Sequence, residues 1–224
     1  MRMILAAAVL IGVASTARSD EKEAEKLIEE TMQAFDKLVD ALKTIKDKST
    51  AVTALPKLKE FDQFVLDKKA ALAKLPPSKL SEESAKSLAA KFEKRMEKLE
   101  VNFRLEYTRV EAIPEAYNVI KDIEMMKLAE EGCVARAKSG VATLTLAMWS
   151  FKLKYGEVPN KLEELFKPPD GGKPFVKKDD LVDPWGRPYE YDPKGPKHKG
   201  SKADIWSVGP RHKEGVIIGN WMVD

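Results

Sequence analysis

The fold of this chain is most clearly indicated by residues 181–191, which read LVDPWGRPYEY. Pro184 and Pro188 fix the backbone dihedral φ on both sides of a Trp-Gly pair, and such Pro/Gly clusters mark turns. Gly186 permits a backbone turn where a side chain would clash. The aromatic and polar residues that alternate in residues 189–191 are typical of a strand. The stretch therefore predicts a rigid turn that leads into a strand.

Two further strand-like runs follow toward the C-terminus. They are residues 205–208 (IWSV) and residues 216–218 (VII), the second of which leads to Trp221. This pattern predicts an antiparallel sheet of about three strands, with one face packed on a long helix. Aromatic residues supply large apolar area to a domain too small for much core. We expect this set to form core rather than a ligand-binding cage: Trp185, Tyr189, Tyr191, Trp206 and Trp221.

A long helix is predicted before the aromatic-rich region. Apolar residues recur at helical spacing through residues 119–151, just after Pro114, so we expect one helix from Glu115 to Tyr155. Gly156 is a suitable residue to end it.

The composition changes after this helix. A short helix over residues 161–166 is predicted first, with Asn160 as its N-cap and Glu163 three residues later as in a capping box. Beyond Phe166, proline, glycine and aromatic residues become frequent, which marks the start of the strand-rich part.

The segment from residue 20 to residue 112 reads as amphipathic helices, each with one apolar stripe. The stripes are Ile28, Met32, Phe35, Val39, Leu42 and Ile45; then Leu58, Phe61, Val65, Leu72 and Leu75 in a helix expected over residues 56–75; then Leu88, Phe92, Met96, Leu99 and Phe103. Pro76-Pro77 is expected to end the second helix, and Ser81 to cap the third. A helical hairpin or bundle buries such stripes, and a coiled-coil seam fits the same intervals. The segment could serve as a spacer, a docking surface or an oligomerisation element.

The N-terminus has the pattern of a secretory signal peptide. One arginine precedes an apolar run over residues 4–13, and small residues follow it. We expect a signal peptide over residues 1–19, cleaved after Ala17 or after Ser19. The alternative is an uncleaved anchor, although the run has about half of the ~20 residues that a membrane span needs. The predicted location is outside the cytoplasm, in the periplasm or the extracellular space, with no stable transmembrane anchor after cleavage.

Composition excludes some classes of function. The formal net charge is +3, and Lys and Glu alternate along the helices, which is typical of a solvated helical surface. Nucleic-acid binding needs clustered basic residues, so no nucleic-acid partner is predicted. The single cysteine, Cys133, lies in an apolar-periodic helix and cannot form an internal disulfide, so we expect a buried apolar side chain rather than a reactive thiol.

No motif for a nucleotide, metal or catalytic site is found. His198 and His212 lie in loops and are expected to be solvated, and the basic loop of residues 194–202 is expected to be a flexible, soluble hairpin tip. Three acids that precede a proline turn are expected to cap it or face water rather than to catalyse: Asp179, Asp180 and Asp183. We therefore predict no catalytic residue, no cofactor, no metal ligand and no enzymatic activity.

Four stretches, taken together, resemble the C-terminal domain of the type II secretion major pseudopilin. They are the helix end and turn of residues 136–159, the turn of residues 181–191, the strand of residues 203–209 (ADIWSVG) and the terminal residues 218–221 (IGNW). The match covers about residues 130–222 and implies a stem helix, a short helix and a small antiparallel sheet. The predicted class is therefore α+β: an N-terminal helical hairpin or bundle, followed by a pseudopilin-like domain.

The chain departs from that family in two respects. Pseudopilins begin with a short basic leader and an apolar helix of about 20 residues, whereas this chain has a signal-peptide-like start and polar helices. The family's domain also usually holds calcium near its last strands. Here the corresponding loop, residues 210–214, reads PRHKE, and its cations would repel the ion. We predict no calcium at this position.

These features predict an exported protein with a structural or protein-interaction role linked to a secretion or pilus-type system, and with secretion or envelope proteins as partners. The alternative is a free-standing envelope scaffold or holdase that reuses the fold. The predicted organisation is a signal peptide (residues 1–19), a helical region (residues 20–112), and a stem helix with the pseudopilin-like domain (residues 113–224).

Overall fold

The structure, a computed structural model, describes residues 21–73 and 81–222. The predicted signal peptide and the Pro76-Pro77 break lie outside the described residues. The chain forms two compact units, Met1–Ala129 and Glu130–Asp224, and each is described by itself. None of the helices in the described part of the chain has the length and apolar character needed to cross a membrane.

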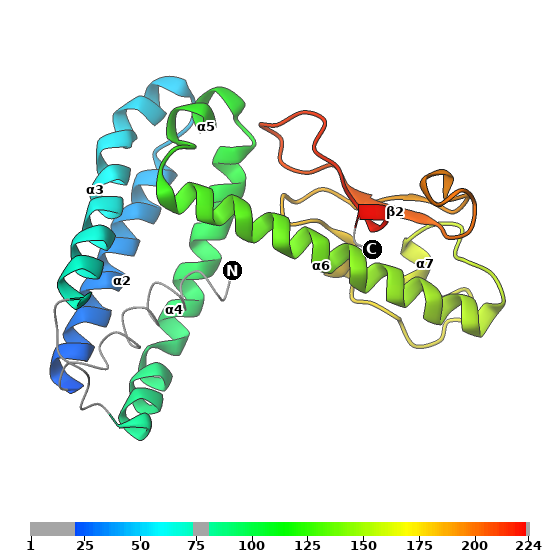
Figure 1. Cartoon of the computed structure of the whole chain (residues 1–224), viewed down its shortest axis with the longest axis horizontal. Helices are drawn as coiled ribbons and strands as arrows, with labels where there is room; N and C mark the ends of the chain where they lie inside the picture. The colour runs from blue at the N-terminus through cyan, green and yellow to red at the C-terminus, as the bar shows by residue number, and fades with distance from the viewer. Residues whose placement is uncertain (1–20, 74–80, 223–224) are drawn as a thin grey trace. The chain divides into compact units, whose positions relative to one another are not determined.

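The first unit is a bundle of helices (Figure 1): α2 (Glu21–Lys43), α3 (Lys48–Ala73), α4 (Glu82–Glu111), α5 (Pro114–Ile120) and the start of α6 (Glu124–Tyr155). Helix α2 packs against α3 and α4, and α5 packs against the same two helices. The predicted first stripe is confirmed as core, since its six residues are at most 3% exposed. The ring of Phe35 lies 5.6 Å from that of Phe61 and 5.2 Å from that of Phe103, which joins the three stripes.

Two predicted helix starts can be compared directly with the structure. Helix α4 begins as expected, because the Ser81 hydroxyl accepts a hydrogen bond from the Ser84 amide at 3.1 Å. Helix α3, however, starts at Lys48, so the predicted start at Pro56 is wrong. The Asp47 carboxylate accepts the Thr50 amide at 2.8 Å and caps the helix, which continues through Pro56.

The predicted single helix from Glu115 to Tyr155 is also wrong, since α5 ends at Ile120 and α6 starts at Glu124. The reason is an acid from another helix. The Asp62 carboxylate of α3 accepts the Glu124 amide at 2.7 Å and the Met125 amide at 3.4 Å. These hydrogen bonds satisfy donors that a helix start leaves free, so a new helix begins there.

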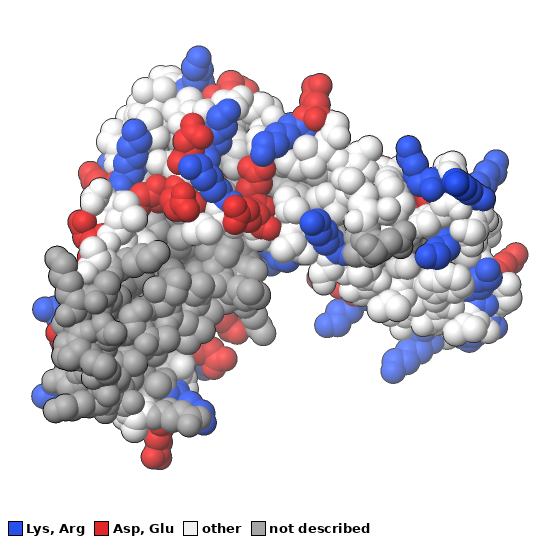
Figure 2. Space-filling view, viewed as in Figure 1, with Lys and Arg blue, Asp and Glu red and all other residues white. Residues whose placement is uncertain are grey.

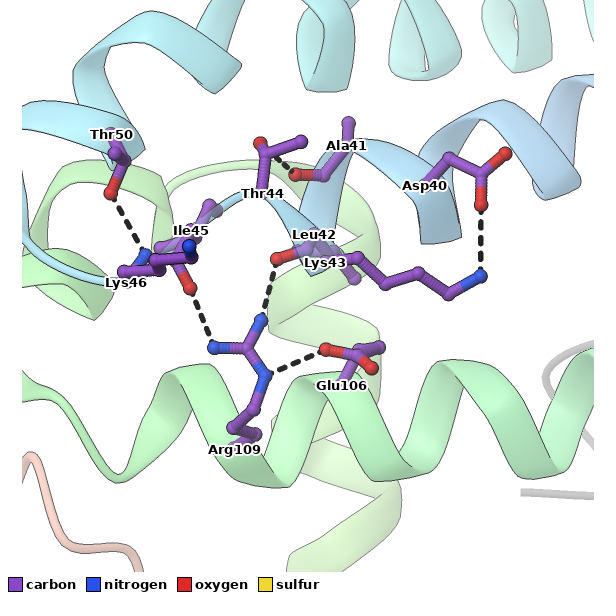
Figure 3. A network of polar contacts seen from close by, with 10 residues as sticks. All are labelled: Asp40, Ala41, Leu42, Lys43, Thr44, Ile45, Lys46, Thr50, Glu106 and Arg109. Atoms are coloured by element: carbon purple, nitrogen blue, oxygen red, sulfur yellow. Dashed lines mark hydrogen bonds and ion pairs between the residues drawn. The ribbon is translucent and has the colours of Figure 1, made fainter.

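The end of α2 is fixed by an arginine from α4 (Figure 3). The Arg109 guanidinium donates to the carbonyl oxygens of Leu42 and Ile45 at 2.8 and 2.5 Å, and to the Glu106 carboxylate at 2.7 Å. A cation at a helix C-terminus satisfies the last carbonyls and interacts favourably with the helix dipole. Arg109 therefore ties the end of α2, far away in sequence, to α4.

The second unit contains the α6 stem from Glu130, a short helix α7 (Glu163–Phe166), and an antiparallel sheet with the order β1-β2-β3. The strands are β1 (Glu190–Asp192), β2 (Asp204–Ser207) and β3 (Ile218–Gly219), with Trp206 opposite both Glu190 and Gly219. Short 3-10 turns are η1 (Lys178–Leu181), η2 (Pro196–His198) and η3 (Asn220–Met222). The α+β class, the stem, the short helix and the three-stranded meander are confirmed.

The core of this unit lies between α6 and the sheet (Figure 1). The stem contributes Val141, Leu144, Met148 and Phe151, and Ile205 of β2 packs against them. Gly156 ends α6 with a φ of 85°, as expected. The predicted capping box of α7 is wrong: α7 starts at Glu163, and the Asn160 amide donates instead to Glu164, at 3.0 Å.

We predict that Arg109→Ala lowers the free energy of unfolding of the helical bundle by about 1–2 kcal/mol, because the carbonyls of Leu42 in α2 and of Ile45 just beyond it lose a charged donor. Lys98→Ala is the matched control, since Lys98 is an exposed cation of the same helix, and it should change stability by less than about 0.5 kcal/mol. Urea unfolding followed by circular dichroism measures both. Equal stability of the two variants would contradict the capping role.

Candidate functional site: the Asp183 turn and the loops around the sheet

The sequence stretch of residues 181–191 folds as a tight hairpin around a buried acid. The Asp183 carboxylate, in a residue that is 4% exposed, accepts the backbone amides of Trp185 and Arg187 at 3.0 and 2.9 Å. Its other oxygen accepts the Ser207 hydroxyl of β2 at 2.6 Å. The hairpin is closed by the Asp183 amide, which donates to the Arg187 carbonyl at 2.7 Å. One carboxylate thus joins the turn to the middle of the sheet.

Trp185 and Gly186 have different roles in this turn. Trp185 is fully buried, which confirms its predicted place in the core. Gly186 has a φ of 78°, and a Cβ atom built there would meet nothing within 4 Å. The predicted clash at Gly186 is therefore wrong. Glycine is favoured there because the backbone is left-handed, a conformation that glycine adopts without steric cost. Some hairpins have such a left-handed residue directly after the turn.

Tyr189 anchors the hairpin to the stem. Its hydroxyl donates to the Ala137 carbonyl of α6 at 3.4 Å, and a Cβ atom at Gly140 would lie 2.1 Å from that hydroxyl. Burial, with Asp183 as a second cause, raises the pKa of Tyr189 to about 12. Gly140 is therefore needed for close approach, and its sequence signal is an isolated glycine inside a helical pattern.

The terminal motif, residues 218–221, pairs a side chain with a strand. The Asn220 amide oxygen accepts the Ile205 amide at 3.1 Å, and its amide nitrogen donates to the Ala203 carbonyl at 3.0 Å. The Asn220 side chain thus extends the hydrogen bonding that β3 makes with β2. The other two tryptophans of the predicted aromatic core, Trp206 and Trp221, are half-buried, with ring centroids 5.8 Å apart.

The basic loop of residues 194–202, expected to be a flexible and soluble tip, is largely exposed and is tied to β2 by hydrogen bonds. Asp204, which is 1% exposed, accepts the Lys197 amide at 2.7 Å, and its other oxygen lies 2.7 Å from Nδ1 of His198. The His198 side chain is 9% exposed. The expectation of a solvated His198 is wrong, because a buried carboxylate of the next strand holds its ring.

The loop between β2 and β3 is held by one acid of the stem. Glu130 of α6 accepts Lys213 Nζ at 2.5 Å, and its second oxygen lies 3.3 Å from Nε2 of His212. The His212 side chain is 2% exposed, so it too is buried rather than solvated. At its start, the loop is tied to the sheet by the Gly209 amide, which donates to the Ser207 hydroxyl at 3.0 Å. We call Glu130, His212 and Lys213 the Glu130 cluster.

Comparison with known proteins places these features in a family. The family model for type II secretion system protein G matches residues 124–221. A type II secretion system core protein G from Xanthomonas campestris pv. campestris is 34% identical over 91 residues, which cover 39% of this chain and 62% of that protein. One from Pseudomonas aeruginosa is 32% identical over 113 residues, which cover 44% of this chain and 78% of that protein. The chain belongs to the type II secretion system protein G family.

The protein G match coincides with the stem helix, the turn and the sheet, and it begins with the first residue of α6. The chain covers less than two thirds of the Xanthomonas relative. No solved structure matches it. The predicted resemblance to the C-terminal domain of protein G is therefore confirmed, and the helical bundle precedes the matched region.

The protein G fold implies a calcium ion near the last strands, and the residues of this loop do not fit one. Calcium is bound by several oxygen ligands. Here Arg211, His212 and Lys213 place cationic or imidazole groups in the loop, and the Glu130 carboxylate is engaged by two of them. Among the described residues, no group of three or more His, Cys, Asp or Glu side chains is placed to hold a metal ion. The Glu130 cluster anchors the loop by charge pairing instead.

The acids and the cysteine that the sequence analysis considered for chemistry differ in how deeply they are buried. Asp179 and Asp180 are exposed, and Asp180 accepts the Lys177 amide at 2.7 Å, so it caps η1. Asp183 is buried and organises the turn, which fits the expectation that it caps the turn. Cys133 is buried, as predicted.

Sequence reasoning missed three residues of the site: Glu130, Gly140 and Asp204. Two of them are acids whose partners lie in other elements, and no local pattern identifies them. The arrangement as a whole fixes loops around a sheet, and this is suited to presenting a rigid surface.

We predict that Asp183→Ala lowers the free energy of unfolding of the second unit by about 3 kcal/mol, because buried donors of the turn and of Ser207 lose a charged acceptor. Asp179→Asn is the matched control, an exposed acid of the same segment, with an expected change below about 0.5 kcal/mol. Tryptophan fluorescence reports this unit alone, since Trp149, Trp185, Trp206 and Trp221 are the chain's four tryptophans. A similar midpoint for both variants would contradict the role of Asp183.

We further predict that neither excess calcium nor a chelator changes the melting temperature of the second unit, because the Glu130 cluster takes the place of an ion. Glu130→Gln should lower the free energy of unfolding by about 1 kcal/mol. Its exposed neighbour Glu131 provides the control variant Glu131→Gln. Melting monitored by tryptophan fluorescence measures the wild type with calcium and with the chelator, and it also measures the two variants. A clear rise of the melting temperature with calcium would show the prediction to be wrong.

Proposed function

We propose that this protein is an exported, non-enzymatic component with a structural or protein-interaction role linked to a type II secretion or pilus-type system. The supporting observation is that its second unit belongs to the protein G family and builds the turn, strand and terminal motifs into one rigid fold. The buried polar residues of that unit, Asp183 and Asp204, hold backbone amides and loops. Both are satisfied by structural hydrogen bonds, which supports a scaffold.

The proposal includes an organisation for the chain. Residues 1–19 act as a secretory signal peptide, and the mature protein resides in the periplasm or outside the cell. The helical region of residues 20–112, on which α5 packs, acts as a spacer or docking element. Residues 113–224 contain the stem and the pseudopilin-like part, whose partners are secretion or envelope proteins.

The packing of the bundle favours this proposal over a holdase. A holdase would bind clients through exposed apolar stripes. The first stripe, residues 28–45, is buried against α3 and α4, and Leu88 and Phe103 of the third stripe are buried as well. These stripes are already covered, so client binding through them would require the bundle to open.

The test is in-cell cross-linking of the full-length chain followed by purification from envelope extracts and mass spectrometry. We expect secretion-system components to be enriched with the wild type and with Asp179→Asn, and to be reduced with Asp183→Ala, because that variant destabilises the turn and sheet of the protein G unit. Purification without any secretion component, or equal recovery by Asp183→Ala, would contradict the proposed function.

A further inference from the structure

The face of α6 opposite the core carries an exposed apolar stripe. Within the second unit, Leu146 is 69% exposed, Trp149 38% and Leu153 87%. The stripe continues toward the helix start with exposed small residues, so that its members are Ala135, Ser139, Ala142, Leu146, Trp149 and Leu153. The other face of the same helix is buried in the core. A helix that is apolar on both faces normally has both faces covered.

The spacing of this stripe indicates the shape of what covers it. Successive members are 4, 3, 4, 3 and 4 residues apart, which is the a/d repeat of a coiled-coil seam. The stripe runs for about 27 Å along the helix. Small residues at one end allow close approach of another helix, and Leu146, Trp149 and Leu153 at the other end supply large contact area. A helix of about five turns fits this surface.

The charges beside the stripe indicate the chemistry of that helix. From Ala135 to Tyr155, α6 carries four basic residues and no acid: Arg136, Lys138, Lys152 and Lys154. Lys154 already pairs with Asp170 at 2.7 Å, whereas Lys138 and Lys152 are exposed. The first acid on this side, Glu131, lies one turn before the stripe. The visible face of this unit in Figure 2 shows uncharged and basic residues with little acidic surface.

A shallow pocket extends the same surface. Its volume is about 130 Å³, and its lining includes Trp149, Lys152, Ser201 and Lys202. Lys152 Nζ lies 5.5 Å from the centre of the Trp149 ring. An apolar anchor and two lysines thus meet at one place, which suits an apolar side chain flanked by carboxylates.

We propose that this face of α6 binds an amphipathic helix of a partner protein, with apolar residues at heptad spacing and acidic residues on their flanks. A second copy of α6 is a poor occupant, because its own lysines and arginine would face those of the first copy. This inference rests on the proposed function, because it names the kind of partner that a protein with an interaction role would bind. The physical claim about the face can be tested separately.

The test uses two synthetic helical peptides with identical leucine heptads, one flanked by glutamates and the other by lysines. Binding to the full-length chain is measured by the anisotropy of a labelled peptide. We expect the acidic peptide to bind and the basic one to bind at least about tenfold more weakly. The double variant Leu146→Ser with Leu153→Ser should bind the acidic peptide about tenfold or more weakly than the wild type does. Both side chains are largely exposed, so the fold should be retained, and tryptophan fluorescence checks this.

The matched control is Ile217→Ser, an exposed apolar residue of the same unit outside the stripe, which should bind the acidic peptide like the wild type. Lys138→Glu combined with Lys152→Glu should reverse the preference between the two peptides. Binding of neither peptide, equal binding of both, or unchanged binding by the double serine variant would overturn the inference. So would a dimer, seen by light scattering, that the double serine variant abolishes.

The same variants separate this inference from the proposed function. If the double serine variant recovers secretion components from cells as well as the wild type does, the inference fails while the proposed function stands. If the acidic peptide binds as expected but no secretion component is recovered, the proposed function fails while the inference stands.

Discussion

The second unit depends on one buried carboxylate, that of Asp183. A charge removed from water is costly unless it is fully hydrogen-bonded. Asp183 meets this condition with two amides of its own turn and the hydroxyl of Ser207 in β2. The hairpin cannot move away from the sheet without depriving one carboxylate oxygen of its Ser207 donor. Gly186, with its left-handed backbone, lets the chain fold back around the acid, and the buried Trp185 fixes the turn in the core.

The same principle recurs in the two loops that border the sheet. Asp204 holds the loop of residues 194–202 through an amide and the ring of His198, and Glu130 holds the loop between β2 and β3 through His212 and Lys213. Each loop is fixed by a carboxylate from a rigid element. Around the last strands, the groups that meet the Glu130 carboxylate, His212 and Lys213, therefore come from within the chain.

The helical unit uses side chains in a comparable way to define where helices begin and end. Asp47 caps α3, Asp62 of α3 caps α6, and Arg109 of α4 caps the end of α2. Because Asp62 and Arg109 each act on an element other than their own, the helix ends are set by packing. This gives a bundle with fixed ends, which is suited to a spacer or docking element.

The sequence by itself determined the class of fold, the stripes of the bundle, the turn around Trp185 and Gly186, the order of the strands and the protein G family. The fold features follow from local patterns, such as periodicity and the placement of proline and glycine, whereas the family rests on the resemblance of four motifs to known pseudopilins. For Asp183 the sequence left open whether the acid caps the turn or faces water, and the structure shows the cap. The sequence contained no sign that the hydroxyl of Ser207 completes the coordination of that acid.

Only the tertiary structure decided the break between α5 and α6, the start of α3, the burial of both histidines and the need for glycine at position 140. Most of these result from a partner in another element: Asp62 for the break, Asp204 and Glu130 for the histidines, and Tyr189 for Gly140. The start of α3 depends instead on a local cap, in which the Asp47 carboxylate accepts the Thr50 amide. The physical reason is that hydrogen bonds and close contacts depend on where side chains meet in space. Local sequence patterns carry information only about the residue's own element.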